Sequence, residues 1–222
     1  MREVVIMSKL LGSLPAVVAA VSGFCASYAR ADDLNPPPWR GQPGSTFQHW
    51  GFLPNSPQGA PDSGLSNPNG VPIMTPSDGG TFYSPVVGDR IGVWGLTPNG
   101  SLNFHVPNDD DPEAIAKYIW IQVTWQGQVL PGLSGVSSTD HSMTIVGDPS
   151  TATLPDGWHH TTWLFSLKEC PDFEVIFLTN NDPTGGTVLI DQVVIDTICI
   201  VPAPGFGALA FAGLIVSGRR RR

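Results

Sequence analysis

Alternation of apolar and polar residues through the second half of the chain restricts it to extended strands. In YIWIQVTW, residues 118–125, every second residue is apolar: Ile119, Ile121, Val123 and Trp125. The same period of two recurs at 101–108 and 160–167, and apolar stretches at 173–179 and 186–200 continue the series. Successive side chains of a strand point to opposite faces, whereas a helix needs a period near 3.6. The pattern therefore predicts strands with one buried face.

Turn-forming residues separate these stretches. The chain contains 25 Gly and 22 Pro, which favour turns and short strands. Only residues 109–118 offer a helical turn, with Asp111 as its cap before Pro112. The stretch 186–200 is apolar on both faces in places, which predicts a central strand or a bulge. We expect an all-β sandwich of jelly-roll type over residues 81–200.

Residues 32–80 are dense in Pro, Gly, Asn and Ser and read as turns and extended segments. Four large rings lie among them: Trp39, Phe47, Trp50 and Phe52. A flexible linker rarely carries so many apolar rings. We expect this segment to pack on the domain.

The first 31 residues have the layout of a secretory signal peptide. Lys9 precedes an apolar stretch, and the small residues Ala29 and Ala31 stand before Asp32, where a signal peptidase would cut. The start is either Met1 or Met7, because a start at Met7 would give a cleaner basic head before the apolar stretch. A retained N-terminal anchor is the alternative.

Charge becomes strongly negative once residues 1–31 are removed. Between Asp32 and Gly218 the bases number four, Arg40, Arg90, Lys117 and Lys168, against 18 acids, which gives a formal charge of −14. Nucleic acid is excluded as a partner, because binding it requires cations that neutralise phosphates. The balance is typical of a solvated, exported protein.

Two cysteines remain after signal removal, Cys170 and Cys199. In an oxidising compartment they are candidates for a disulfide that closes a loop of about 30 residues. Two buried thiols are the alternative.

The C-terminus combines a proline-interrupted lead, an apolar stretch and terminal arginines. As a helix, residues 205–218 would span about 21 Å at 1.5 Å per residue, which is short of a hydrocarbon core of about 30 Å. Pro202 and Pro204 discourage extension of that helix. The arginines would stay in the cytoplasm. We expect a short membrane helix at 205–218 that anchors only marginally.

This tail resembles the PEP-CTERM sorting signal of exported proteins of Gram-negative bacteria. The residues that carry the resemblance are Val201, Pro202, Pro204, Arg219, Arg220, Arg221 and Arg222. Ala203 stands where the family usually has glutamate. The resemblance covers residues 201–222 and implies recognition by a membrane processing enzyme of the exosortase type. It also implies an association with extracellular polysaccharide. A plain C-terminal anchor that is never cut is the alternative.

Aromatic residues on the outward face supply one binding hypothesis. If Ile119 and Trp163 face the core, the side chains on the opposite face of the same region include Tyr118, Trp120, Trp158 and His160. Rings beside polar groups can stack on sugars, so these four are candidate glycan-binding residues. The alternative is that the rings pack under the Pro-rich segment 32–80.

Motifs for catalysis or tight metal binding are missing from the sequence. It contains no HExxH, no paired CxxC and no GxSxG. We therefore expect no catalytic residue, no metal ligand set and no cofactor. Acidic loops at 108–113, Asp148, Asp156 and Asp182 are candidate Ca²⁺ ligands, with plain solvated loops as the alternative.

These observations predict an exported, non-catalytic protein with a structural or adhesive role. It would be held briefly in the inner membrane and then reach the cell surface or extracellular matrix. A secreted carbohydrate-binding module is the first alternative. A β-sandwich glycoside hydrolase, or another hydrolase, is the second.

Overall fold

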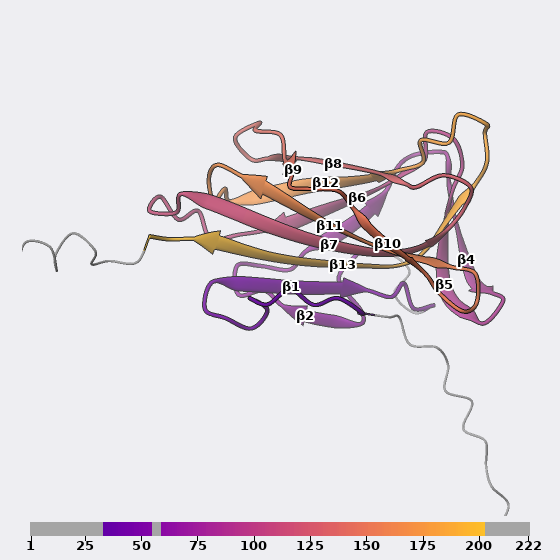
Figure 1. The fold of residues 1–222 in the computed structure, drawn as a ribbon, viewed down its shortest axis with the longest axis horizontal. Helices are drawn as coiled ribbons and strands as arrows, with labels where there is room; N and C mark the ends of the chain where they lie inside the picture. Colours follow the sequence, from indigo (N-terminus) through magenta and orange to yellow (C-terminus); the bar gives the residue numbers. More distant parts are fainter. Residues whose placement is uncertain (1–32, 55–58, 203–222) are drawn as a thin grey trace, which may run out of the picture.

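The computed structural model describes residues 33–54 and 59–202, and this part of the chain is all-β, as the alternation predicts (Figure 1). It contains thirteen strands and no helix. Accordingly, nothing within the described ranges is a helix long and apolar enough to cross a membrane. The predicted signal peptide 1–31 and tail helix 205–218 lie outside the described residues.

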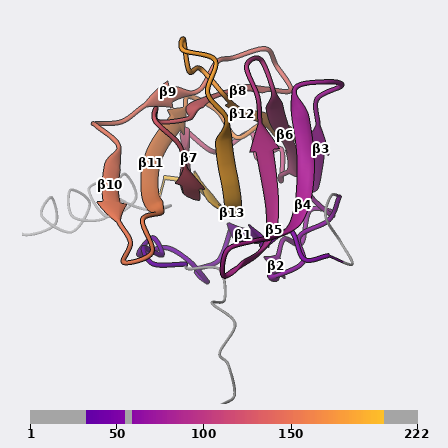
Figure 2. The same ribbon diagram turned by 90° about the vertical axis from the view of Figure 1, so that its right-hand side faces the viewer.

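Two antiparallel sheets face each other, as the views in Figures 1 and 2 show. The larger sheet has nine strands: β1 (Ser45–Trp50), β2 (Gly64–Ser66), β4 (Thr81–Val87), β5 (Arg90–Leu96), β7 (Ala116–Gln126), β9 (Thr144–Ile145), β10 (Ser150–Thr153), β11 (His159–Leu167) and β13 (Val188–Ile200). The smaller sheet has four strands: β3 (Ile73–Pro76), β6 (Ser101–Pro107), β8 (Gly132–Ser137) and β12 (Phe173–Thr179). The arrangement is consistent with a β-sandwich.

Strand β13 is the centre of the larger sheet. One of its edges pairs with β7 along most of its length, and the other pairs with β1 and then with β5. Beyond β7 lies β11, whose far edge is shared by β9 and β10. Of the described strands, the last, β13, is therefore the neighbour of the first, β1 (Figure 1).

The core lies between the two sheets and is filled by the alternating apolar residues. Ile121 stands opposite both Trp163 of β11 and Ile195 of β13, so the three side chains share one face. From the smaller sheet, Phe104 and Ile176 are fully buried against them. The core faces inferred from the sequence for 101–107, 118–125 and 160–167 are therefore confirmed.

A β-bulge interrupts β13. Its register against β7 shifts between Ile190 and Gln192, so Asp191 is the extra residue. The stretch 186–200 is thus both a central strand and a bulged one, which the two-sided apolar pattern allowed.

Two local expectations change. Residues 32–80 were expected only to pack on the domain, but they also supply strands β1, β2 and β3. Strand β1 was not predicted because its alternating segment, STFQHW, lies among Pro and Gly residues. The predicted helical turn at 109–118 is wrong. The Asp111 carboxylate accepts the backbone N–H of Glu113 in a turn, and β7 already begins at Ala116.

At the end where β13 finishes, a buried ion pair and a disulfide connect the two sheets. Lys117 Nζ of β7 donates to Glu174 Oε2 of β12 over 2.8 Å, and both side chains are 0% exposed. Burial lowers the pKa of Lys117 and raises the pKa of Glu174, while each partner opposes the shift of the other. Cys199, the register partner of Lys117 on β13, is disulfide-bonded to Cys170, just before β12.

Removing one member of the ion pair should cost more than removing both. We expect Lys117→Met to lower the free energy of unfolding by about 3–5 kcal/mol, because Glu174 is left buried without its partner. The double variant Lys117→Met with Glu174→Leu should recover most of that loss. Urea denaturation of the two variants checks this, and an equal loss in both would contradict it.

Candidate functional site

The outer face of the larger sheet carries a continuous chain of polar side chains. His49 Nε2 donates to Gln192 Oε1, and Gln192 Nε2 donates to Thr124 Oγ1, both over 2.9 Å. The network then passes to His160, whose Nδ1 lies 3.0 Å from Thr124 Oγ1 and whose Nε2 lies 3.2 Å from Gln122 Oε1. Because a carboxamide oxygen only accepts, the contacts with Gln192 Oε1 and Gln122 Oε1 place a proton on Nε2 of both histidines. Burial also lowers the pKa of His49.

The N-terminal strap, residues 33–40, covers this polar face. Gln122 Nε2 donates to Asp33 Oδ1 over 2.8 Å, and the backbone N–H of Asn35 donates to Gln122 Oε1 over 2.8 Å. Trp120 Nε1 donates to the carbonyl of Asn35 over 2.8 Å. These bonds satisfy polar groups that the strap removes from water.

Arg40 fixes the far end of the strap. Its guanidinium donates to both oxygens of Asp196 on β13, over 2.5 and 2.7 Å, and also to Asp33. It lies 4.2 Å from the centre of the Phe47 ring. Burial raises the pKa of Asp196 to about 6, although Arg40 opposes the rise. Burial also acts to raise the pKa of Asp33, but hydrogen bonds from Arg40 and Gln122 bring it below its ordinary value.

A cavity of about 450 Å³ remains beside the strap, above Trp120. Asn35 and Pro36 of the strap line it, as do Val146 and Asp148 from the connection between β9 and β10 and Ser150 at the start of β10. The remaining lining residues are Trp120, Thr162, Trp163 and Leu164.

The four predicted glycan-binding residues do not form one open surface. Trp158 and His160 are 4% and 1% exposed, so the expectation that they face solvent is wrong. Alternation located His160 on the outer face, but other side chains cover that face. Tyr118 and Trp120 are half-buried beside Trp39, with ring centres 6.2 and 5.9 Å from it. Only Trp120 lines the cavity.

Trp158 belongs to a separate ion-pair cluster around Arg90. The Arg90 guanidinium lies 5.5 Å from the Trp158 ring. It donates to Asp156 and to Asp191, the bulge residue of β13, with the shortest contacts at 2.6 and 2.8 Å. The bulge therefore aims a carboxylate at a buried cation, which explains why it is built into the central strand.

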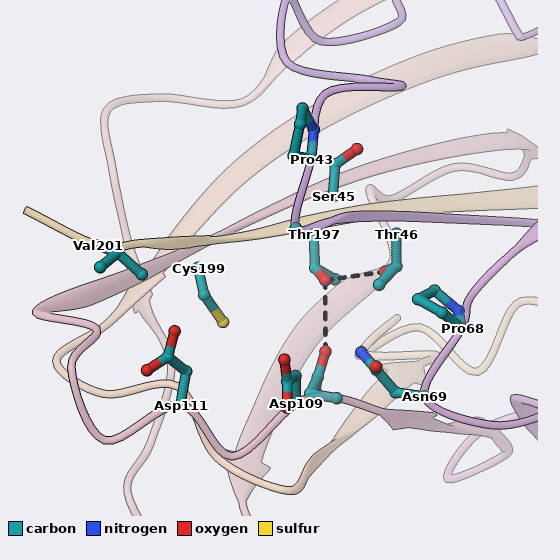
Figure 3. A pocket seen from close by; sticks show the side chains of 12 residues that line it. Pro43, Ser45, Thr46, Pro68, Asn69, Asp109, Asp111, Thr197, Cys199 and Val201 are labelled. Atoms are coloured by element: carbon teal, nitrogen blue, oxygen red, sulfur yellow. Dashed lines mark hydrogen bonds between the residues drawn. The ribbon is translucent and has the colours of Figure 1, made fainter. Parts of the chain in front are cut away.

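A second cavity, of about 510 Å³, lies where β13 ends (Figure 3). The side chains of Asp109, Asp111, Cys199 and Val201 surround it. Thr197 connects the sheets nearby, since its hydroxyl contacts Thr46 at 2.9 Å and Asn108 at 3.4 Å.

The predicted calcium ligands are dispersed over different loops. Asp156 pairs with Arg90, and Asp182 accepts hydrogen bonds from Thr184 in its own turn. Asp148 lines the Trp120 cavity, whereas Asp109 and Asp111 line the second cavity. Within residues 33–54 and 59–202, no three His, Cys, Asp or Glu side chains gather as a metal site.

Ser137, His141 and Glu169 form a cluster that was not predicted from the sequence and that contains the residue types of a hydrolase triad. Glu169 Oε1 accepts hydrogen bonds from Ser137 at 2.8 Å and contacts His141 Nδ1 at 2.8 Å. A nucleophile relay requires the histidine between the hydroxyl and the carboxylate. Here the carboxylate lies between the other two, so the cluster fastens the loop after β8 to the loop before β12.

Sequence comparison adds no family to this description. No protein-family model matches the chain, and no curated protein sequence is significantly similar to it.

The raised pKa of Asp196 gives the strap a pH signature. Between the ordinary value of 3.8 and about 6, the folded protein holds this proton while the unfolded chain has lost it. The stabilisation from protonated Asp196 is therefore lost as pH rises through about 6. Urea denaturation of the wild type and of Asp196→Asn at several pH values checks this. As pH rises from 4 to 7, the free energy of unfolding of the wild type should fall relative to that of Asp196→Asn, which has no proton to lose at this position. Parallel curves would contradict it.

Proposed function

We propose that the protein is exported and acts without catalysis as a structural or adhesive component of the cell surface or extracellular matrix. In this proposal residues 1–31 direct export, and residues 201–222 are a sorting tail of the PEP-CTERM type, read by an exosortase-type enzyme. The described body is the part that functions outside the cell.

The disulfide between Cys170 and Cys199 is the observation that carries the proposal. Structural disulfides persist in oxidising compartments and are rare in the cytosol. The bond closes a loop with a sequence separation of 29, which stabilises by about 3–4 kcal/mol in the chain-entropy model. It lies two residues before Val201, so it fastens the last strand where the tail begins.

Position gives this disulfide a mechanical meaning. A protein held through its C-terminus is pulled at the end of β13. There the disulfide leads to the segment before β12, and Lys117 connects β7 to Glu174 on β12. Load on the tail would therefore be shared by both sheets, which suits an anchored or adhesive protein.

Surface charge supports the same proposal. Of the four cations in the described residues, Arg40, Arg90 and Lys117 are engaged in ion pairs, and Lys168 is exposed. The described body presents an acidic surface, because most of its carboxylates have no cation beside them. Such a surface favours solubility outside the cell and disfavours nucleic acid.

The finer fold assignment is also a proposal, namely a jelly roll. Its support is the strand order, because the strands from β5 to β8 alternate between the sheets, as do β11, β12 and β13. The first and last strands are also neighbours within the larger sheet.

Intact mass of the protein recovered from its native cell envelope tests the proposal. We expect a chain that begins at Asp32 and lacks the helix and arginines of 205–222. A variant with Arg219–Arg222 replaced by Gln should accumulate with its tail attached. Recovery of the wild type with residues 205–222 still present would contradict sorting and favour a plain C-terminal anchor, and recovery with residues 1–31 still present would contradict signal removal and favour an N-terminal anchor.

A further inference from the structure

We propose that the Trp120 cavity is a binding site for a neutral saccharide chain. This inference adds a ligand to the proposed function and does not rest on it, since binding in solution is independent of export and tail processing.

The cavity has the construction of a small-molecule site. Its floor is the outer face of β7 and β11, where Trp120 and Leu164 are register partners. The strap forms one wall, and the β9–β10 connection, with exposed Val146 and Asp148, forms the other. A volume of about 450 Å³ lies within the range of roughly 300–1,000 Å³ for ligand pockets.

The ring of Trp120 is held in place before any ligand arrives. Its N–H is committed to the Asn35 carbonyl at 2.8 Å, and it meets Trp39 edge-on with an interplanar angle of 89°. The indole remains partly exposed at the cavity. A fixed ring presents an apolar face, with negative charge at its centre, for the C–H groups of a sugar and loses little entropy on binding.

Groups that can hydrogen-bond to hydroxyls surround that ring. Asp148 has no hydrogen-bond or ion-pair partner among the described residues, so both of its oxygens can accept. Thr162 Oγ1 already accepts from Asn35 Nδ2 at 3.2 Å, which leaves its own proton to donate. Ser150 adds another hydroxyl. A ligand with several adjacent hydroxyls engages all of these groups.

Charge narrows the ligand class further. Among the described residues that line the cavity there is no Lys, Arg or His, and Asp148 is the one charged residue, so anionic sugars and phosphates are disfavoured. An organic ammonium group could pair with Asp148 and lie over the Trp120 ring, but it would leave the hydroxyls of Ser150 and Thr162 without a role. A neutral sugar fits the whole lining.

Calorimetric titration of the purified, oxidised full chain tests this site. The neutral probes are hexasaccharides of glucose, mannose and xylose. Oligogalacturonate is the anionic probe and choline the cationic one. We expect binding of at least one neutral probe. Trp120→Ala should weaken it by at least about tenfold, and Asp148→Asn should weaken it to a smaller extent.

Two further variants separate loss of the site from loss of the fold. Val146→Trp fills the cavity from an exposed loop position and removes no hydrogen bond of the strap, so it should abolish binding while the unfolding curve stays unchanged. Phe82→Ala, an exposed ring on β4, is the matched control and should bind like the wild type. The proposal is overturned if no neutral probe binds, if Val146→Trp binds normally, or if either charged probe binds more tightly.

Discussion

Three cations that the fold removes wholly or largely from water hold together parts of the chain that are distant in sequence. Arg40 pairs with Asp196 across 156 residues, Arg90 with Asp191 across 101, and Lys117 with Glu174 across 57. A buried charge is tolerated only beside a counter-charge, so each pair specifies one junction. The junctions are strap to β13, β5 to the bulge, and one sheet to the other. Because the described residues include only four cations, the use of three of them in internal ion pairs also leaves the exterior acidic.

Strand β13 links these junctions to the proposed function. It carries Asp191 and Asp196 on the way to Cys199, and the proposed sorting tail follows directly. The same strand is therefore the structural centre of the larger sheet and the connection to the proposed tail. The strap that Asp196 holds through Arg40 closes most of the polar outer face and leaves the Trp120 cavity beside it.

Alternation in the sequence was enough to predict β6, β7 and β11 with their buried faces, and the apolar stretches predicted β12 and a central or bulged β13, but β1, β2 and β3 were not predicted. It could not reveal what covers an outward face, because that depends on contacts between distant segments. His160 lies on the face expected, yet it is buried and hydrogen-bonded to Thr124 and Gln122. Arg40 was one residue whose role the sequence could have indicated, because a cation is rare in this acidic chain and is expected to pair with a carboxylate. The Trp120 cavity lies between the strap and the β9–β10 connection. Its position depends on how these two distant segments pack, which a local sequence pattern does not predict.

The central claim is that this body matures outside the reducing cytosol with its last strand bonded to the segment before β12. Thiol alkylation of the denatured, unreduced protein tests that claim most directly. It compares the protein from cells that express the full chain with the protein from cells that express a variant without residues 1–31. The account predicts that Cys170 and Cys199 resist alkylation in the exported chain and both react in the chain retained by loss of the leader. Free thiols at both positions in the protein made with its leader would contradict it.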